Sequence, residues 1–508
     1  MKRTFGRFLG SWVVTMLVGA TSVLVMARPA AASTSYDPKD DVNSMYGTTA
    51  YTGVTDWWDA GFTGEGVDVA VIDTGVVPVD GLATPGKIVY GPDLSLDSQT
   101  PELRNLDANG HGTFMAGIIA GNDGGSFLGV APDARIVSVK VGATDGSVDV
   151  SQVIAAIDWV VQHRHDNGLN IRVLNLSYGT DSTQPYTVDP LAFAVEQAWK
   201  AGIFVVAATG NEGYVFKTGT LTNPAFDPKI FAVGASDSMG TARTSDDTVA
   251  PFSSTGSNAR YVDVVAPGSH IVSLRVPGSF IDQVNGSTGY VSDTLFRGSG
   301  TSEAAAFTSG EAALAIQQRP AITPDKLKKL LLSNARPLNG YSSIQEGQGV
   351  VDMSSTLGAR TCNAPKQWNT IAWSTGTGSL ELSRGTEHLI DGVVPLAGEM
   401  DIFGNEFNAP QMAAAERAEA SWTGGVWNGS TWSGSTWSGN TWSGSTWSGS
   451  TWSGNTWSGS TWSGSTWSGS TWSGSTWSGS TWSGSTWSKN TWSSNRWSGN
   501  AWLGATWR

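Results

Sequence analysis

The stretch Val67-Asp68-Val69-Ala70-Val71-Ile72, followed at once by Asp73-Thr74-Gly75, decides the fold class of this chain. A run so rich in β-branched residues is typical of a strand that is covered on both faces. The glycine permits a sharp turn directly beside the carboxylate. Because open α/β sheets carry their chemistry at the carboxyl ends of the strands, we expect Asp73 to lie at the functional edge of a largely parallel sheet.

Similar apolar runs recur along the chain, with helical patterns between them. Residues 149–164 and 191–201 carry apolar side chains at the spacing of amphipathic helices. Alternation of strands and helices indicates βαβ units, so residues 48–358 are predicted to form a three-layer α/β sandwich. The further predicted strands are Ile136–Val141, Val173–Ser177, Ile203–Ala208 and Ile230–Gly234.

The two ends of the chain differ from this region in composition. Residues 1–32 join basic residues, an apolar run and Ala30-Ala31-Ala32, which predicts a secretory signal peptide. Residues 33–47 are expected to be an N-terminal extension, and residues 359–420 a spacer that includes a short Ala/Glu-rich helix. In residues 421–508, Thr-Trp-Ser-Gly-Ser/Asn repeats, and 18 of the 25 tryptophans stand there at every fifth position.

The repeat tail admits two interpretations. The tryptophan rings could form ladders, either alternating between two sides or stacked in rows. Such ladders could bind cell-wall polysaccharide or other copies of the chain. Alternatively, the tail is a low-complexity Ser/Gly-rich extension without a fixed fold. The density of tryptophan favours the first interpretation, because so many exposed indoles are unfavourable in water.

Charge, cysteine content and hydropathy restrict the environment and the partners. The formal net charge of −13 disfavours binding to nucleic acid and to anionic lipid. Cys362 is the single cysteine, so no intramolecular disulfide can form. Past the signal peptide, no run approaches the roughly 20 apolar residues of a membrane span. We therefore expect a mature chain without a transmembrane anchor, secreted and either extracellular or associated with the cell surface.

A histidine and a serine stand at two expected helix starts. In Asn109-Gly110-His111-Gly112-Thr113, one of the five histidines is surrounded by small residues that leave its imidazole accessible. In Gly298-Ser299-Gly300-Thr301-Ser302, a Gly-rich turn opens into an Ala-rich helix. A serine nucleophile needs a base for its proton and donors for the oxyanion, whereas an ordinary helix cap would use the same serine structurally.

An asparagine completes the set of polar candidates. Asn211 stands in a Gly-flanked turn after the strand predicted at 203–208. Its amide suits an oxyanion donor, although asparagine is also common in turns for conformational reasons. Taken alone, Asp73-Thr74-Gly75 would also fit an aspartic protease, in which two carboxylates share a proton. That chemistry needs a second such block, and the chain has none.

The candidate residues follow one another along the chain in the order Asp, His, Ser. With this order, the four blocks resemble the subtilisin (subtilase) family over residues 48–358. The resemblance implies a subtilisin-like fold and a secreted serine endopeptidase acting on proteins or peptides. It implies that Ser302 is the nucleophile, His111 its general base and acid, Asp73 the residue that orients His111, and Asn211 an oxyanion donor.

The resemblance also covers substrate binding and metals. Ser177, Tyr178, Gly179 and Gly210 match the segments that pair with an extended substrate as an added strand. No cofactor is required. Structural calcium is possible in this family, but the loop 121–126 looks shorter than the usual calcium loop, so no metal ligand is assigned.

Glu303 departs from the family pattern, because many relatives carry methionine directly after the nucleophile. A side chain at a helix start can point outward, and an acidic one there is compatible with the helix dipole. The departure, together with the tail, leaves an alternative function: a cell-surface binding or structural protein whose subtilisin-like domain is a non-catalytic scaffold.

Overall fold

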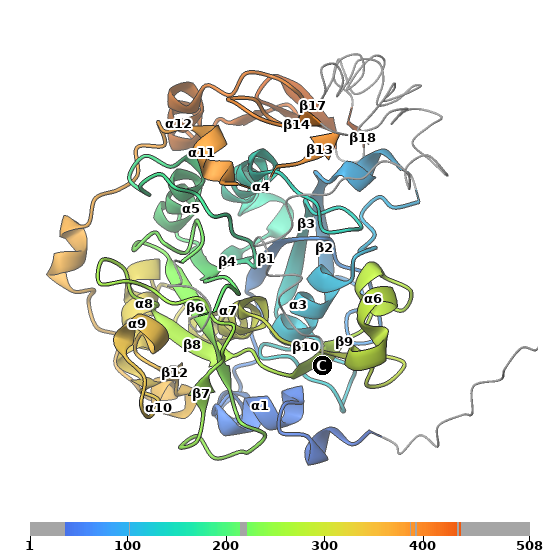
Figure 1. Ribbon diagram of the computed structural model, residues 1–508. Helices are drawn as coiled ribbons and strands as arrows, with labels where there is room; N and C mark the ends of the chain where they lie inside the picture. The colour runs from blue at the N-terminus through green and yellow to red at the C-terminus, as the bar shows by residue number, and fades with distance from the viewer. Residues whose placement is uncertain are drawn as a thin grey trace, which may run out of the picture. The chain divides into compact units, whose positions relative to one another are not determined.

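The computed structural model describes residues 36–437 except 101, 214–220, 387, 392–393 and 434–435. The predicted signal peptide, 1–32, and the tail beyond residue 437 lie outside the described residues. A ten-stranded sheet crosses the middle of the described part (Figure 1). Its order is β11-β12-β8-β6-β5-β4-β1-β3-β2, with β7 beside β6. All pairs from β2 to β12 are parallel, whereas β11 and β7 run antiparallel to their neighbours.

The strands predicted from sequence are all present, with ends shifted by at most three residues. They are β1 (Asp68–Asp73), β3 (Arg135–Lys140), β4 (Ile171–Leu176), β5 (Phe204–Ala208) and β6 (Phe231–Asp237). Every residue of β1 is buried, as expected of a central strand with helices on both sides. The strands that were not predicted are shorter or partly exposed: β2 (Ile88–Asp93), β7 (Thr248–Val249), β8 (Val264–Pro267), β11 (Ala335–Arg336) and β12 (Val350–Val351).

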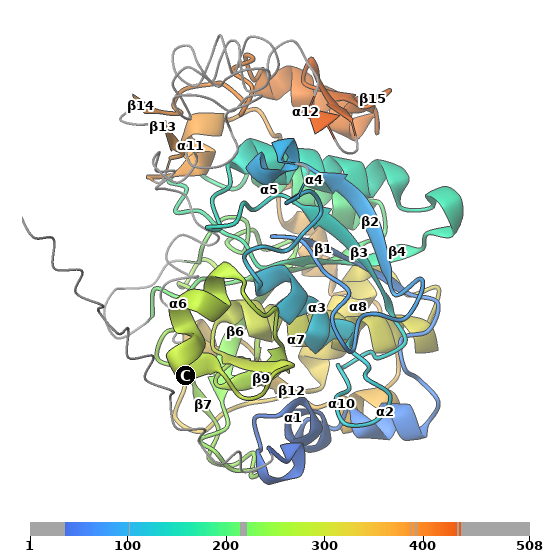
Figure 2. The same cartoon turned by 90° about the vertical axis from the view of Figure 1, so that its right-hand side faces the viewer.

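Helices form a layer on each side of the sheet, which confirms the three-layer α/β prediction. In Figure 2, α4 (Val150–His163) and α5 (Pro190–Lys200) lie above the sheet, and α3 (His111–Ala120) and α7 (Thr301–Gln318) lie below it. The predicted helices 149–164 and 191–201 correspond to α4 and α5. Further elements around this body are α2 (Thr55–Asp59), α6 (Phe280–Gly289), α8 (Pro324–Ser333), α9 (Ser343–Glu346), α10 (Met353–Leu357), β9 (Ile271–Leu274) and β10 (Leu295–Gly298).

The expected N-terminal boundary at residue 48 is wrong, because it falls inside α1 (Met45–Tyr51). The preceding residues are also attached to the main body. Asp41 accepts a hydrogen bond from Arg297 at 2.6 Å, and the carbonyl of Asn43 accepts one from the amide of Val272 at 3.1 Å. The domain therefore includes the part of the expected extension that the structure describes.

The expected spacer, 359–420, is also wrong as a description of this segment, since its described residues form an additional layer over α4 and α5. Figure 1 shows α11 (Leu380–Arg384) and α12 (Ala409–Arg417) above these two helices. Leu380, Ile402 and Phe407 belong to the same continuous apolar core as the sheet. Their spacing follows neither a helix nor a strand, which is why periodicity did not reveal them. Smaller elements here are η4 (Lys366–Thr370), β13 (Ile390–Asp391) and β14 (Val394–Pro395).

Arg384 fastens the additional layer to the start of α4. Its side chain is 0% exposed, and its Nε donates to Asp149 Oδ2 at 2.7 Å. Nη1 donates to the Gly398 carbonyl at 2.6 Å and to Glu381 at 3.1 Å, and Nη2 donates to the Met400 carbonyl. Asp149 is also the N-cap of α4. One buried ion pair therefore joins two segments that are far apart in the sequence.

The first tryptophans of the repeat belong to the folded body. The indole of Trp422 donates to the carbonyl of Ala155 at 2.8 Å, and that of Trp427 donates to Asp158 at 2.8 Å, both on α4. The described repeat units form the antiparallel strands β15 (Trp422–Thr423), β16 (Val426–Trp427), β17 (Ser430–Ser433) and β18 (Thr436–Trp437).

Two-residue turns connect β15 to β16 and β16 to β17 at the start of the tail. Both residues of Gly424-Gly425 and both of Asn428-Gly429 have positive φ, as type I′ hairpin turns require. Turns of this type after β15 and after β16 reverse the chain, so Trp422 lies opposite Trp427 in the ladder. The first units therefore form hairpins, an arrangement that neither interpretation of the tail specified.

A pair of buried carboxyl groups lies where the additional layer meets α4. Burial raises the pKa of Asp158 to about 7, although the indole of Trp427 and Ser421 lower it in part. Burial, followed by the charge of Asp158, raises the pKa of Glu416 on α12 well above its usual range, against a smaller lowering by Arg417. Glu416 Oε2 has no hydrogen-bond partner among the described residues. The pair is therefore most stable when it is protonated.

This pair predicts that the folded state weakens as the pH rises. Both carboxyl groups hold protons more tightly when folded than when unfolded, so their contribution is complete below about pH 4. The contribution of Asp158 is lost as the pH rises through about 7, and that of Glu416 as the pH rises through its own raised pKa. Glu416→Gln removes one titration. The thermal midpoint of Glu416→Gln should exceed that of the parent by a margin that grows from pH 4 to pH 8, both measured with Ser302→Ala to prevent self-digestion. A constant margin would contradict the prediction.

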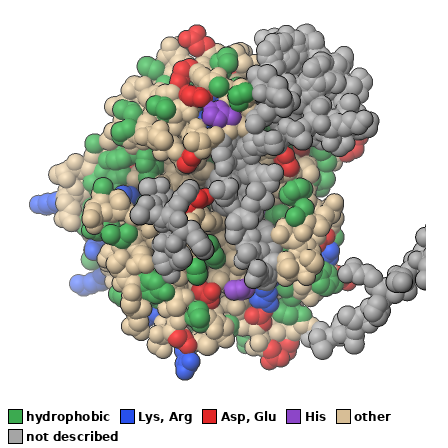
Figure 3. All heavy atoms as spheres, viewed as in Figure 1, with side chains coloured by type: hydrophobic (Ala, Val, Ile, Leu, Met, Phe, Trp, Pro, Cys, Tyr) green, Lys and Arg blue, Asp and Glu red, His purple; other side chains and the backbone are tan. Residues whose placement is uncertain are grey.

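Two surface features complete the description. No helix among the described residues has both the length and the apolar character to cross a bilayer. On the face in Figure 3, acidic side chains are spread over the described surface, and basic ones lie mostly near its rim. Charge alone therefore does not mark a binding region on this face, and the site must be located from its reactive side chains.

Candidate active site

Asp73 and His111 form a buried pair at the centre of the fold. Asp73 is the last residue of β1, and His111 is the first residue of α3. The imidazole Nδ1 lies 2.9 Å from Asp73 Oδ1 and 3.0 Å from Oδ2. A carboxylate at Nδ1 holds the imidazole in the tautomer that leaves Nε2 as the acceptor, and it stabilises the imidazolium cation.

Asp107, which was not predicted from the sequence, supplies a second carboxylate that holds this pair in place. Asp107 accepts hydrogen bonds from the amides of Gly110 at 2.7 Å and Thr113 at 2.8 Å, and from the hydroxyl of Thr74 at 2.8 Å. Thr74 Oγ1 in turn accepts the amide of Gly112 at 3.0 Å. Asp107 thus ties the strand end of Asp73 to the helix start of His111. Burial raises its pKa, in opposition to these hydrogen bonds. In the sequence, the position of Asp107 four residues before His111 could have indicated this role.

Thr301 links Asn211 to Ser302, because it directly precedes Ser302 and makes hydrogen bonds to Asn211. Asn211 Oδ1 accepts hydrogen bonds from the amide and the hydroxyl of Thr301, both at 2.9 Å. The amide of Gly210 donates to Thr301 Oγ1 at 3.2 Å. Because its oxygen faces Thr301, the NH₂ group of Asn211 faces the opposite way. The turn after β5 is therefore held against the first turn of α7, in which Ser302 is 4% exposed.

The predicted substrate segments lie beside this turn. Ser177 Oγ donates to the Ser302 carbonyl at 3.3 Å, which brings the end of β4 to the nucleophile. A Cβ at Gly179 or at Gly210 would meet Thr222, at 2.3 and 2.7 Å respectively. Tyr178 is 1% exposed, so only its backbone could contact a substrate. Glycine is required at 179 and 210 because both backbones pass close to the same threonine.

Comparison with known proteins agrees with this arrangement. Residues 64–351 match the model of the subtilase family. The chain belongs to the subtilase family. Membership makes it a serine endopeptidase, and its parallel sheet flanked by helices is that of a subtilase domain.

Curated relatives support the same assignment over the same part of the chain. Serine protease AprX of Bacillus subtilis (strain 168) is 40% identical over 304 residues, which are 58% of this chain and 67% of the relative. Subtilisin DY of Bacillus licheniformis is 32% identical over 296 residues, 58% of this chain and 92% of the relative. The minor extracellular protease Epr of Bacillus subtilis (strain 168) is 33% identical over 297 residues, 58% of this chain and 39% of the relative.

The position after Ser302 does not have the geometry expected from the sequence. Glu303 does not point outward but is 1% exposed, within the first turn of α7. Burial raises the pKa of its carboxyl group to about 7, while the charge of His111 lowers it and that of Asp73 raises it. Glu303 follows Ser302 directly, so this buried carboxyl group belongs to the same helical turn as the proposed nucleophile.

The loop expected to be too short for calcium is closed on itself. The carboxylate of Asp123 accepts hydrogen bonds from the amides of Gly125, Ser126 and Phe127 at 2.8 to 2.9 Å. Calcium takes six to eight oxygen ligands, several of them carboxylates. No group of three or more acidic, histidine or cysteine residues is arranged for a metal within the described ranges. These residues therefore do not fit a calcium ion.

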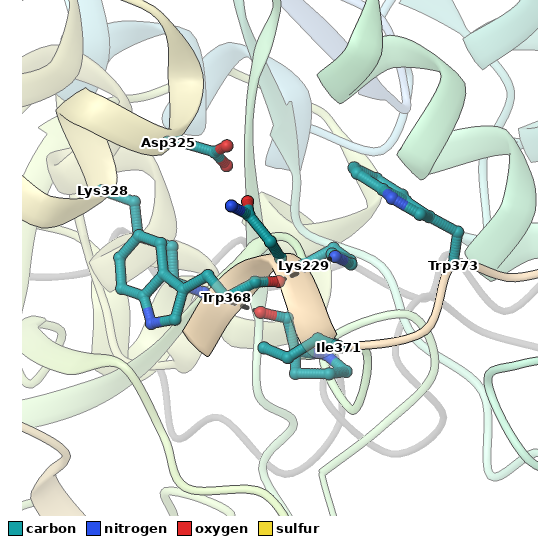
Figure 4. A pocket seen from close by; sticks show the side chains of 8 residues that line it. Lys229, Asp325, Lys328, Trp368, Ile371 and Trp373 are labelled. Carbon is teal, nitrogen blue, oxygen red and sulfur yellow. Dashed lines mark hydrogen bonds between the residues drawn. The ribbon is translucent and has the colours of Figure 1, made fainter. Parts of the chain in front are cut away.

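A separate hollow lies between α8, the loop before β6 and the segment 366–373. Its volume is about 260 Å³, and none of the site residues named above lines it. Figure 4 shows Trp368 and Trp373 on either side of Lys229. The Lys229 ammonium lies 4.0 Å from the centroid of Trp373 and donates to the Trp368 carbonyl at 3.2 Å. These two contacts of Lys229, one with the Trp373 ring and one with the Trp368 carbonyl, attach the segment 366–373 to the loop before β6.

Proposed function

We propose that this chain is a secreted serine endopeptidase that hydrolyses peptide bonds through an acyl-enzyme on Ser302. The observation that carries the proposal is the buried contact of His111 Nδ1 with both carboxylate oxygens of Asp73. A histidine held in this way is suited to serve as a general base at neutral pH. The proposed mechanism needs no cofactor, and structural calcium remains without assigned ligands.

In the first half of the reaction, His111 Nε2 takes the proton of Ser302 Oγ as the oxygen attacks the substrate carbonyl. The imidazolium then gives this proton to the leaving amine, and Asp73 stabilises the cation without taking the proton itself. In the second half, a water molecule loses its proton to His111 and attacks the acyl-enzyme. The proton then returns to Ser302, and the carboxylic acid product leaves.

Asn211 would stabilise the oxyanion that forms in each half. Replacement by leucine keeps the approximate volume but removes the NH₂ donor. We expect Asn211→Leu to lower kcat by about 10² to 10³ with little change in KM, the range known for the loss of such a donor in subtilisin. Asn258→Leu, in an exposed turn, is the matched control and should leave kcat unchanged. A loss below threefold for Asn211→Leu would exclude this role.

Substrate binding is proposed to use backbone groups on both sides of Ser302. An extended peptide would pair with Ser177-Tyr178-Gly179 on one side and with the strand end near Gly210 on the other. The hydrogen bonds that join these segments to α7 support the role. Such backbone pairing favours extended chains, so denatured proteins should be better substrates than folded ones.

Covalent labelling tests the proposed nucleophile. A fluorophosphonate that reacts with activated serine hydroxyls should label the wild-type chain once and should not label Ser302→Ala. Circular dichroism would show that the variant is folded. Folded wild-type protein without label would instead favour the alternative of a cell-surface binding or structural protein on a non-catalytic scaffold.

Secretion and the role of the tail are further parts of the proposal. The segment 1–32 supports export, and the relative Epr is itself named as an extracellular protease. The regular tryptophans support attachment to cell-wall polysaccharide or self-association. Sedimentation of the Ser302→Ala chain with purified cell wall, compared with a chain ending at residue 437, tests attachment. Equal sedimentation of the two chains would argue against it.

A further inference from the structure

Ser383 connects the additional layer to the segment that is proposed to pair with substrate. It lies on α11, it is 0% exposed, and its carbonyl accepts a hydrogen bond from the hydroxyl of Thr180 at 2.6 Å. Thr180 directly follows the predicted substrate segment 177–179. Ser383 lies outside residues 64–351, which match the family model. The contact therefore belongs to the additional layer of this chain and not to the matched domain alone.

The other groups of Ser383 reach the partner of Thr180 in the backbone. The amide of Thr180 donates to the Asn223 carbonyl at 3.0 Å, and its carbonyl accepts the Asn223 amide at 2.8 Å. The hydroxyl of Ser383 accepts a hydrogen bond from Asn223 Nδ2 at 3.2 Å and donates to Asp189 Oδ1 at 3.1 Å. Ser383 thus holds both members of the Thr180–Asn223 pair, through two different oxygen atoms.

Asn223 follows Thr222, which lies against both proposed substrate segments. The backbones of Gly179 and Gly210 each pass so close to Thr222 that a Cβ would clash with it. The amide of Thr222 also donates to the carbonyl of Thr209 at 3.1 Å. A displacement of residues 222–223 would therefore move the backbone on both sides of the proposed nucleophile.

The residue after Thr180 is held by the same part of the additional layer. The carboxylate of Asp181 accepts hydrogen bonds from the amide of Thr386 at 2.7 Å and from its hydroxyl at 2.5 Å. Gly385 permits this contact, because a Cβ there would lie 1.9 Å from Asp181 Oδ1 and because its φ is +76°. Residues 383–386 therefore contact two successive residues that follow the substrate segment.

We propose that Ser383 is a positioning residue for substrate binding, which acts through Thr180 and Asn223 to hold the segment 177–179 in the course that an extended peptide needs. The inference rests on the proposed function and deepens it, because it makes the additional layer part of substrate recognition. Pairing of a peptide with a strand requires backbone donors and acceptors at fixed spacing. Loss of order at residue 180 should therefore weaken binding of a long substrate more than it slows the chemistry at Ser302.

Substrates of two lengths test this role. Thr180→Val removes the hydroxyl donor with almost no change in volume. For each variant, kcat and KM are measured with an extended chromogenic peptide, and kcat/KM with p-nitrophenyl acetate, an ester too short to pair with the segment. In Thr180→Val, the ratio of kcat/KM for the peptide to kcat/KM for the ester should fall about tenfold, mainly through a higher KM for the peptide, because a buried hydrogen bond behind the binding segment is lost. An unchanged ratio would overturn the inference, even if the variant were less stable.

Two further threonine variants show whether the hydrogen bond to Ser383 is responsible. Thr180→Ser keeps the hydroxyl and should keep the ratio within about twofold of the wild type. Thr375→Val is the matched control, because the Thr375 hydroxyl also joins the additional layer to the main body, by donating to the Thr187 carbonyl at 3.2 Å. It should leave the ratio unchanged. A fall in either variant as large as that in Thr180→Val would overturn the inference.

Another variant keeps the test decisive if Thr180→Val does not fold. Ser383→Ala then takes its place, since it removes the hydrogen bonds with Asn223 and Asp189 but leaves the carbonyl that accepts from Thr180. The ratio should fall about threefold to tenfold. An unchanged ratio in folded Ser383→Ala would then overturn the inference.

The same measurements separate this inference from the proposed function. Rates are divided by the fraction of protein that reacts with the fluorophosphonate, so unfolded protein does not count. Hydrolysis of the peptide by the wild type that disappears in Ser302→Ala supports the peptidase whatever the ratio does. An unchanged ratio in Thr180→Val then refutes the role of Ser383 alone. If the folded wild type hydrolyses neither substrate and takes no label, both are wrong.

Discussion

Ser302→Ala should lower kcat for peptide hydrolysis by about 10⁶, the loss measured for the nucleophile of subtilisin. His111→Ala should lose a similar factor, because a serine hydroxyl is a poor nucleophile when no base takes its proton. The double variant should be no slower than either single variant, since each change removes the same step. Initial rates on a denatured protein and on a chromogenic peptide would measure all three.

Residual activity is as informative as the loss. The oxyanion donors and the substrate strands remain in these variants, so they should still exceed the uncatalysed rate by about 10³ to 10⁴. Asn211→Leu in the Ser302→Ala background should remove part of this remainder. If the loss in the double variant instead equals the product of the two single losses, His111 and Ser302 act independently. That result would contradict the proposed mechanism, in which the two residues carry out one step together.

Arg384→Met should lower the free energy of unfolding by about 3 to 5 kcal/mol, the usual cost of removing one partner of a buried ion pair. The variant leaves Asp149 charged, with its exposed fraction at 0% and its cation gone. It also leaves the carbonyls of Gly398 and Met400 without their donor. Denaturant unfolding in the Ser302→Ala background, followed by tryptophan fluorescence, would measure the loss.

A second variant and a surface pair serve as controls for Arg384. Asp149→Asn in addition to Arg384→Met removes the uncompensated charge and should recover part of the lost stability. Arg243 pairs with Asp246 at 2.9 Å, but its side chain is 76% exposed. Arg243→Met should therefore leave the unfolding midpoint almost unchanged. Equal midpoints for Arg384→Met and Arg243→Met would show that the buried pair does not hold the additional layer.

Local sequence patterns were sufficient to predict the central sheet and to recognise the family. The run ending at Asp73 and the four other predicted strands are β-branched because both of their faces are covered, and each has a strand in the structure. Asp73 and His111 could be paired from sequence only through the resemblance to subtilases. Their contact at 2.9 Å joins residues 38 positions apart, a distance in sequence over which periodicity carries no information.

The additional layer had no comparable signal. Leu380, Ile402 and Phe407 are separated by turns, so their burial depends on the surface that α4 and α5 present to them. Trp422 and Trp427 look like the other tail tryptophans in sequence. Both are nevertheless core residues, because Ala155 and Asp158 happen to offer acceptors to their indoles.

The sequence by itself determined the α/β class and the parallel strands, since these follow from composition and spacing within short stretches, whereas the proposed reactive residues were named through the resemblance to subtilases. Tertiary structure alone decided that Glu303 faces inward, that Asp107 supports His111 and that Arg384 joins the additional layer to α4. The physical reason is the same in each case. Whether a charged side chain is buried depends on the helix or strand that packs over it, and that neighbour comes from a distant part of the chain.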